Sequence, residues 1–219
     1  MVTVPLHDQT YAALKEALLE GRIPPGQPVS VASLSALLGV GTMPMREAVR
    51  RLTAEGGLAA SATRRLTVPD LGPERFEALI HARRLLEPEA AVEALPHVDA
   101  ARIEALAAID DGLTQAIGVG DVAGYMRLNY RFHFGLYRAA PGSVLSPLIE
   151  SLWLQFGPYM HVLFAQVPTH LAADRHQEAL AALRSRDAAA LREAVVNDIE
   201  DALRTLRAAV SAGSLSATP

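Results

Sequence analysis

The fold is decided by the stretch Pro44-Met-Arg-Glu-Ala-Val-Arg-Arg-Leu52, which follows the short turn Gly39-Val-Gly41. Its apolar residues recur at helical spacing and form one face: Met45, Val49 and Leu52. Its arginines fall outside that face and are expected on the surface: Arg46, Arg50 and Arg51. Thr42 can cap the helix, and Pro44 is tolerated in the first turn because the N–H groups there have no helical partner. The stretch therefore predicts a helix that presents arginines.

Two more helices are expected before this one. Residues 7–21 place tyrosine and leucine side chains at helical spacing and end at a glycine followed by Pro24-Pro-Gly26. A second, short helix follows Ser30 and ends at Gly39, because glycine readily adopts the left-handed conformation that closes helices. A helix, a glycine turn and a helix with exposed arginines together form the helix-turn-helix pattern.

Two short extended runs follow Gly56-Gly57, at 58–61 and 66–69, and predict a hairpin, or wing, beside the third helix. A guanidinium group donates two parallel hydrogen bonds to a phosphate or a guanine edge, so arginines here suit double-stranded DNA. The expected DNA-contacting residues lie on the third helix and at the hairpin tip: Thr42, Arg46, Arg50, Arg51, Arg64 and Arg65. The alternative is a solvated basic helix with structural ion pairs, such as Glu47 with Arg50 or Arg51.

Composition and charge support a small basic unit joined to a larger acidic one. The chain has 219 residues, of which 50% are hydrophobic and none is cysteine, so a large core is expected and thiolate metal sites are excluded. Residues 1–70 carry seven Lys and Arg against six Asp and Glu, a balance of +1, whereas 71–219 carry thirteen against eighteen, a balance of −5. The first residues lack a secretion signal and no long apolar run occurs, so we expect a cytoplasmic protein with no membrane partner.

The first unit resembles the GntR family of bacterial winged-helix transcription regulators. The matching motifs occur in order over about residues 7–70: Gly21-Arg-Ile-Pro-Pro-Gly26, Leu37-Leu-Gly-Val40, Pro44-Met-Arg-Glu-Ala-Val-Arg-Arg-Leu52 and Ala54-Glu-Gly56. Gly41 and Thr42 stand where the family usually has Ser-Arg, so one customary DNA-contacting arginine is missing and the operator sequence is not implied. The wing glycine is also absent, with Arg65 near its place.

The second unit is expected to be a helical bundle. Helical periodicity continues to about residue 210, with breaks at proline, glycine or Arg-Asp positions: Pro96, Gly118-Val-Gly120, Pro141-Gly142, Gly157-Pro158, Pro168 and Arg186-Asp187. The fold class is therefore mainly α: a winged helix-turn-helix domain at 1–70, an all-helical effector-binding and dimerisation domain at 71–210, and a flexible tail at 211–219.

Polar residues interrupt the apolar faces of three helices in this second unit. Asn129 and His133 lie one turn apart on the first, His176 interrupts the second and Asp198 the third. Buried polar groups need partners, so these residues should meet one another, a ligand or a metal. Imidazole and oxygen donors suit Zn²⁺, Ni²⁺, Mn²⁺ or Fe²⁺, although a single histidine on an apolar face is more often a satisfied core residue.

Residues 71–210 resemble the all-helical FCD domain that follows the winged helix in one GntR subfamily. Three motifs carry the resemblance: Arg83-Arg-Leu-Leu-Glu87, Asn129-x-x-Phe132-His133, and Arg175-His-Gln-Glu-Ala-Leu180 before Arg186-Asp187. In many FCD domains a carboxylate and three histidines hold a divalent metal, which implies the ligand set Asn129, His133, His176 and Asp198. Asn129 here replaces the acid and Asp198 the third histidine, so the alternative is weaker binding or a metal-free polar pocket.

Arg83 lies on an apolar stripe, where an inward guanidinium can clamp a carboxylate effector or pair with Glu87 one turn on. The predicted function is a homodimeric regulator whose affinity for operator DNA is controlled by a small carboxylate in a helical, metal-containing pocket. The alternatives are a metal-dependent helical enzyme and a helical interaction module. No His-Glu-x-x-His pair, phosphate-binding glycine loop or Gly-x-Ser-x-Gly elbow occurs, which argues against an enzyme.

Overall fold

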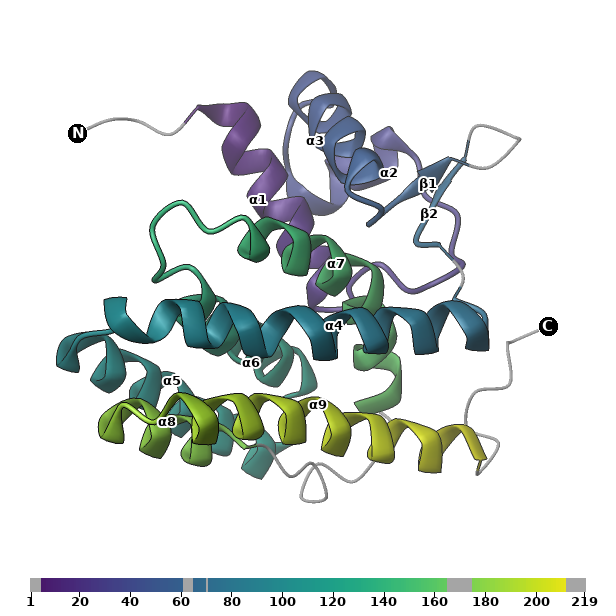
Figure 1. The fold of residues 1–219 in the computed structure, drawn as a ribbon. Coiled ribbons are helices and arrows are strands. Elements are labelled where there is room, and N and C mark those ends of the chain that lie inside the picture. The colour runs from purple at the N-terminus through teal and green to yellow at the C-terminus, as the bar shows by residue number, and fades with distance from the viewer. Residues whose placement is uncertain (1–4, 61–64, 70, 165–174, 212–219) are drawn as a thin grey trace.

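The structure, a computed structural model, describes residues 5–60, 65–69, 71–164 and 175–211. Its N-terminal part has the helix-turn-helix and hairpin expected from the sequence (Figure 1). The elements follow in this order: α1 (Leu6–Leu19), α2 (Val31–Leu38), α3 (Thr42–Ala54), β1 (Ala59–Ala60) and β2 (Leu66–Thr67). The mainly α fold class, with a small winged unit before a helical bundle, is confirmed.

The start of α2 is well capped, whereas the start of α3 differs from the expectation. Ser30 accepts a hydrogen bond from the Ser33 N–H, and the Ser33 hydroxyl in turn accepts one from the Ser30 N–H. The N-cap of α3 is Gly41, and Thr42 is already the first helical residue. The prediction that Thr42 caps α3 is therefore wrong, because the extended residue before the helix lies one position earlier.

The wing attaches to the helices through its second strand. Ala59 pairs with Thr67 and Ala60 with Leu66 in an antiparallel ladder. Leu66 also bridges to Val29, two residues before the start of α2, through backbone hydrogen bonds in both directions. The hairpin is therefore fixed beside the helix-turn-helix by main-chain bonds.

The remaining helices form a bundle in which α4 and α9 run alongside each other over much of their length (Figure 1). The elements are α4 (Pro73–Ala94), the 3₁₀ turn η1 (Leu95–His97), α5 (Ala100–Val119), α6 (Val122–Tyr137), α7 (Leu145–Phe164), α8 (His176–Ser185) and α9 (Ala188–Ser211). Helix α5 packs against α6 and α8, and α8 packs against α9. Helix α7 lies between α4 and α1, so it joins the bundle to the N-terminal helices.

The helix break expected at Gly157-Pro158 does not occur, and α7 continues through both residues. Proline costs a backbone hydrogen bond inside a helix, but Phe156 and Met160 on either side are buried, so packing holds the helical path. Gly157 has its own role, since a Cβ there would lie 3.0 Å from the Leu19 Cδ2. The missing side chain lets α1 approach α7 closely.

A polar cluster ties α1 to the bundle. The Lys15 ammonium on α1 donates to the Glu150 Oε1 on α7 at 2.8 Å. Two further groups donate to the same oxygen: the hydroxyl of Tyr130 on α6 and the guanidinium of Arg138, the C-cap of α6. Burial raises the pKa of Glu150, but the hydrogen bonds from Lys15 and Tyr130 outweigh it and hold the pKa below its ordinary value. The cluster therefore joins three helices through one carboxylate.

None of the described helices is both long enough and apolar enough to cross a membrane.

Two leucines on α1 offer a matched test of this packing. Leu14 is fully buried where α1 packs on α3, whereas Leu6 is 61% exposed. We expect Leu14→Ala to lower the free energy of unfolding by about 2–5 kcal/mol, through lost burial and a residual cavity, and Leu6→Ala to change it by less than about 1 kcal/mol. Urea denaturation of both variants measures the difference, and equal losses would contradict the packing described here.

Candidate functional site

The outer face of α3 carries the arginines that the sequence predicts to be exposed. Arg46 and Arg50 are both exposed. The Arg50 guanidinium donates to both carboxylate oxygens of Glu47, from Nε at 2.9 Å and from Nη2 at 2.5 Å, and this hydrogen bonding lowers the pKa of Glu47. The ion pair given as the alternative is therefore present for Arg50. It is a surface pair, screened by solvent, that contributes little to stability.

Arg51 is less exposed than predicted. It is half-buried, its Nη1 donates to Asp8 Oδ1 at 2.9 Å, and its guanidinium carbon lies 3.8 Å from the centre of the Tyr11 ring. Both partners belong to α1, so Arg51 holds α3 against α1. The expectation that Arg51 lies on the outer surface is corrected, because an aromatic face and a carboxylate one turn apart on α1 draw the guanidinium inward.

The other predicted DNA contacts lie at the start of α3 and beside the wing. Thr42 is exposed in the first turn of α3. Arg65 is exposed immediately before β2. Arg64 lies outside the described residues. These residues therefore remain predictions as DNA contacts.

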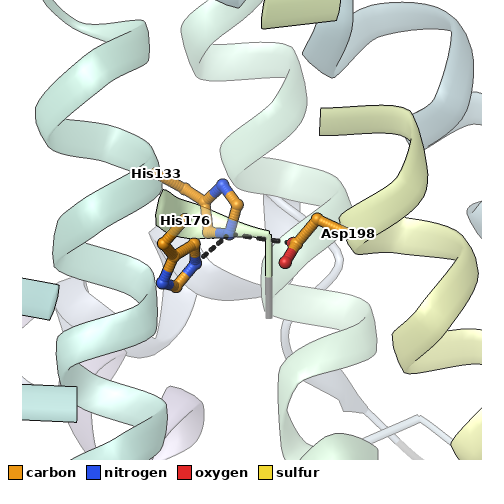
Figure 2. Close-up of side chains that lie close together, drawn as sticks. All are labelled: His133, His176 and Asp198. Atoms are coloured by element: carbon orange, nitrogen blue, oxygen red, sulfur yellow. Dashed lines mark hydrogen bonds and ion pairs between the residues drawn. The ribbon is translucent and has the colours of Figure 1, made fainter. Parts of the chain in front are cut away.

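Three of the four predicted metal ligands converge inside the bundle, each from a different helix (Figure 2). His133 lies on α6, His176 is the first residue of α8 and Asp198 lies on α9. The two Nε2 atoms are 3.3 Å apart, and the His133 Nε2 is 3.3 Å from the Asp198 Oδ2. Both histidines are buried and Asp198 is nearly so. All three donor atoms lie within 4.8 Å of one another.

This geometry fits a divalent transition-metal ion. At metal–ligand distances of about 2.1 Å and tetrahedral angles, neighbouring donor atoms are about 3.4 Å apart. At this site the His133 Nε2 lies 3.3 Å from both the His176 Nε2 and the Asp198 Oδ2. Two imidazole nitrogens and one carboxylate oxygen also form a donor set that such ions accept. The three residues could therefore hold Zn²⁺, Ni²⁺, Mn²⁺ or Fe²⁺ with only small adjustments.

Asn129, the fourth predicted ligand, lies one turn before His133 on α6 and is half-buried. Within the described part of the chain its amide makes no hydrogen bond. It faces the same side of α6 as His133 by helical spacing, so its role as a fourth donor stays a prediction.

Each of the three converging side chains is held by a further group. The Asp110 Oδ1 on α5 lies 2.9 Å from the His176 Nδ1, and the Tyr137 hydroxyl lies 3.0 Å from the His133 Nδ1. The backbone N–H of Arg175 donates to the Asp198 Oδ1 at 3.2 Å. Asp110 and Tyr137 were not among the site residues expected from the sequence. Asp110 was detectable, since it sits on a stripe of buried residues in α5: Ile103, Leu106, Asp110 and Leu113.

Burial and neighbouring groups shift the pKa values of Asp198 and Tyr137 at this site. Burial raises the pKa of Asp198, but the hydrogen bond to His133 and the charges of both histidines outweigh burial and hold that pKa well below its ordinary range. Asp198 therefore stays ionised. Burial raises the pKa of Tyr137 well above its ordinary value, and the neighbouring Glu87 carboxylate adds to the effect. The Tyr137 hydroxyl therefore keeps its proton.

Arg83 pairs with Glu87, the alternative given for it above. Its Nε donates to the Glu87 Oε1 at 2.5 Å, and its guanidinium carbon lies 4.7 Å from the Trp153 ring centre and 4.8 Å from that of Phe156. Glu87 is fully buried and also accepts hydrogen bonds from the Trp153 Nε1 and the Tyr137 hydroxyl, each at 2.9 Å. An effector carboxylate would have to compete with Glu87 for this guanidinium.

Both parts of the chain match known protein families. Residues 78–201 match the FCD domain, and residues 6–68 match the bacterial regulatory proteins of the gntR family. The HTH-type transcriptional regulator McbR of Escherichia coli (strain K12) is 30% identical over 195 residues, which cover 85% of this chain and 86% of that protein.

Solved structures agree with this placement. The structure of E. coli McbR/YncC superposes with a TM-score of 0.87 at 26% identity, covering 95% of this chain and all of that one. A putative GntR regulator from Rhodococcus sp. RHA1 shares the fold, with a TM-score of 0.70 at 22% identity over 92% of this chain and 98% of the other.

The histidine cluster makes a direct prediction for metal binding. We expect His176→Ala to weaken Zn²⁺ or Ni²⁺ binding by about 100-fold or more, because one of the converging donors is removed. Equilibrium dialysis followed by metal analysis measures the affinity. His81→Ala, which removes an exposed histidine on α4, is the matched control and should bind metal as the wild type does. Equal affinities of all three proteins would exclude this cluster as the site.

Proposed function

This chain belongs to the GntR family of bacterial regulatory proteins and carries an FCD domain, and from that premise we propose that a divalent cation and a small carboxylate effector in its helical bundle control its affinity for operator DNA. The chain is thus a DNA-binding transcriptional regulator, and its relatives are regulators and not enzymes. We place the division between its DNA-binding and effector-binding domains near residue 70, in the interval between the gntR match, which ends at residue 68, and the FCD match, which begins at residue 78.

The observation that carries the metal part of the proposal is the convergence of three donors from three helices. His133, His176 and Asp198 are separated by many residues in sequence but bring their donor atoms within 4.8 Å of one another in a buried site. A metal ion held by these residues would supply a Lewis acid that attracts an effector carboxylate. We propose Asn129, one turn before His133 on α6, as the fourth donor.

The DNA-binding part of the proposal rests on the outer face of α3. Arg46 is exposed, and Arg50 is exposed and forms a surface ion pair with Glu47. A DNA phosphate can replace such a carboxylate partner at little cost, because the pair is already solvated. Thr42 and Arg65 extend the proposed contact surface, and Arg64, outside the described residues, stays a contact expected from the sequence alone. Arg51 supports this surface from behind by holding α3 on α1.

Helix α6 offers a physical connection between the two parts. It carries His133 at the histidine cluster, and one turn earlier it carries Tyr130, which donates to Glu150. Glu150 also accepts from Lys15 on α1, and α1 packs against α3. A small displacement of α6 would therefore reach α3 through a short chain of contacts.

Control of DNA binding then requires two arrangements of a dimer. We propose that effector binding at the cluster shifts α6, and that the two α3 helices of a homodimer change their spacing relative to the half-sites of the operator. Arg83 takes part through Glu87 and Tyr137, which connect it to His133. Ligand and DNA affinities are coupled reciprocally in such a scheme.

The proposed DNA surface predicts that Arg46→Ala weakens binding to the operator. Loss of one arginine that contacts a phosphate or a base should reduce affinity by about 10-fold or more and reduce the slope of log affinity against log salt by about one. Fluorescence anisotropy over a range of salt concentrations measures both quantities. Arg184→Ala, which removes a half-exposed arginine of α8, has the same charge change and should leave both unchanged. If operator affinity and its salt dependence were the same in Arg46→Ala as in the wild type, α3 would be excluded from the proposed interface.

The proposed connection predicts that Glu150→Gln uncouples the two sites. Metal loading of the wild type should change operator affinity by about 5–150-fold, the usual range for coupled sites, whereas in the variant the factor should approach one. The reason is that an amide holds Lys15, Tyr130 and Arg138 far less strongly than a carboxylate does. Metal affinity measured separately should stay unchanged. A full coupling factor in Glu150→Gln would show that the signal takes another route.

A further inference from the structure

We propose that Met43 is a specificity-determining residue of this regulator, and that its side chain contacts the methyl group of a thymine in the major groove of the operator. This inference deepens the DNA-binding part of the proposed function and rests on it. Met43 carries no charge that could bind a phosphate. It would therefore add to the arginines of α3 a contact that depends on base sequence.

Met43 is far more exposed than an apolar side chain of α3 needs to be. It is 77% exposed, more than any other large hydrophobic residue in the described part of the N-terminal unit, residues 5–60 and 65–69. Met45, two positions later, is fully buried and faces the core. A single exposed hydrophobic residue is common on protein surfaces, so the position of Met43 on its helix has to decide its role.

Met43 lies in the first turn of α3, on the same face as the two exposed arginines. Arg46 follows three residues later and Arg50 seven residues later, and these spacings bring side chains to one side of a helix. Helix α3 packs on α1 and α2, at the opposite end of the molecule from α9 (Figure 1). In a helix-turn-helix, the N-terminal residues of the second helix contact base edges. Met43 therefore lies at the part of α3 that meets the bases.

The chemistry of methionine selects one group among those in the major groove. Its side chain has no N–H or O–H to donate, and its thioether sulfur is a weak acceptor. Adenine, guanine and cytosine are distinguished in this groove by polar donors and acceptors, whereas thymine also presents a C5-methyl group. Contact with that methyl group buries apolar surface on both sides, and the flexible methionine chain can adapt its shape to it. Contact with a polar edge would leave that edge without a hydrogen-bond partner.

The charges around Met43 allow DNA to approach closely. Glu47 lies one turn after Met43, and both of its carboxylate oxygens accept hydrogen bonds from Arg50. Two arginines, Arg46 and Arg50, stand against this one glutamate on the same face. The face that surrounds Met43 is therefore positively charged and attracts the phosphates on either side of the groove.

Deletion of single methyl groups from the DNA tests the contact directly. The probe is a duplex that the wild-type protein selects from a random-sequence pool. Uracil, which pairs as thymine does but lacks the methyl group, replaces thymine at one position at a time in both half-sites. We expect one such replacement to weaken wild-type binding by about 16-fold, because the loss of one buried methyl group costs about 4-fold in each of two half-sites. Fluorescence anisotropy measures the affinity.

The matching change in the protein is Met43→Ala. We expect this variant to bind the thymine duplex about 10-fold more weakly than the wild type, and to bind the thymine and uracil duplexes equally within about 2-fold, because the partner of the methyl group is gone. The slope of log affinity against log salt should stay unchanged, since no charge is removed. Met43→Leu keeps an apolar side chain and should retain the preference for thymine.

Val119→Ala is the matched control, since it truncates an apolar residue that is 81% exposed at the end of α5, and it should behave as the wild type does. The inference is overturned if Met43→Ala keeps the full wild-type loss on uracil replacement, or if no replacement weakens wild-type binding. In both cases the selected duplex still establishes DNA binding. A wild type that selects no duplex from the pool overturns the proposed DNA-binding function together with this inference.

Discussion

The bundle depends on pairing the charged and polar groups that its helices bury. Glu87 is fully buried on α4, and it would cost several kcal/mol to leave such a carboxylate without partners. Arg83, Trp153 and Tyr137 each donate to it, and Tyr137 passes the chain of hydrogen bonds on to His133. These contacts join α4, α6 and α7, so the buried polar groups determine how the helices lie against one another.

The same polar chain leads to the candidate metal site, where three helices meet. His133 stands at its end, facing His176 from α8 and Asp198 from α9. Helix α6 carries Tyr130 as well, and through Glu150 it contacts α1. A site that is built from several helices responds when one of them moves, and packed cores shift between discrete arrangements more readily than they deform continuously. The fold therefore suits a regulator in which ligand binding and DNA binding share structural elements.

Much of the fold and part of the site could be predicted from local sequence. The helix-turn-helix followed from apolar spacing and glycine turns, and the inward direction of His133, His176 and Asp198 followed from their places on apolar faces. The errors share one cause. Arg51 was expected outside because its helix face alone was considered, and its partners on α1 lie forty residues away. The helix break at Gly157-Pro158 was expected from local preference, which burial on both sides overrides.

The sequence by itself determined that the fold is mainly helical, and it determined the approximate ends of the helices. It also determined the surface position of Arg46 and the inward direction of the histidines. These properties depend on neighbours within a few residues along the chain. The tertiary structure alone decided which inward residues meet, that Asp110 and Tyr137 support the histidines, and that Arg83 pairs with Glu87 beside Trp153. The physical reason is that a contact between helices depends on their relative rotation and distance, which are set by the packing of the whole bundle and not by the spacing along any one helix.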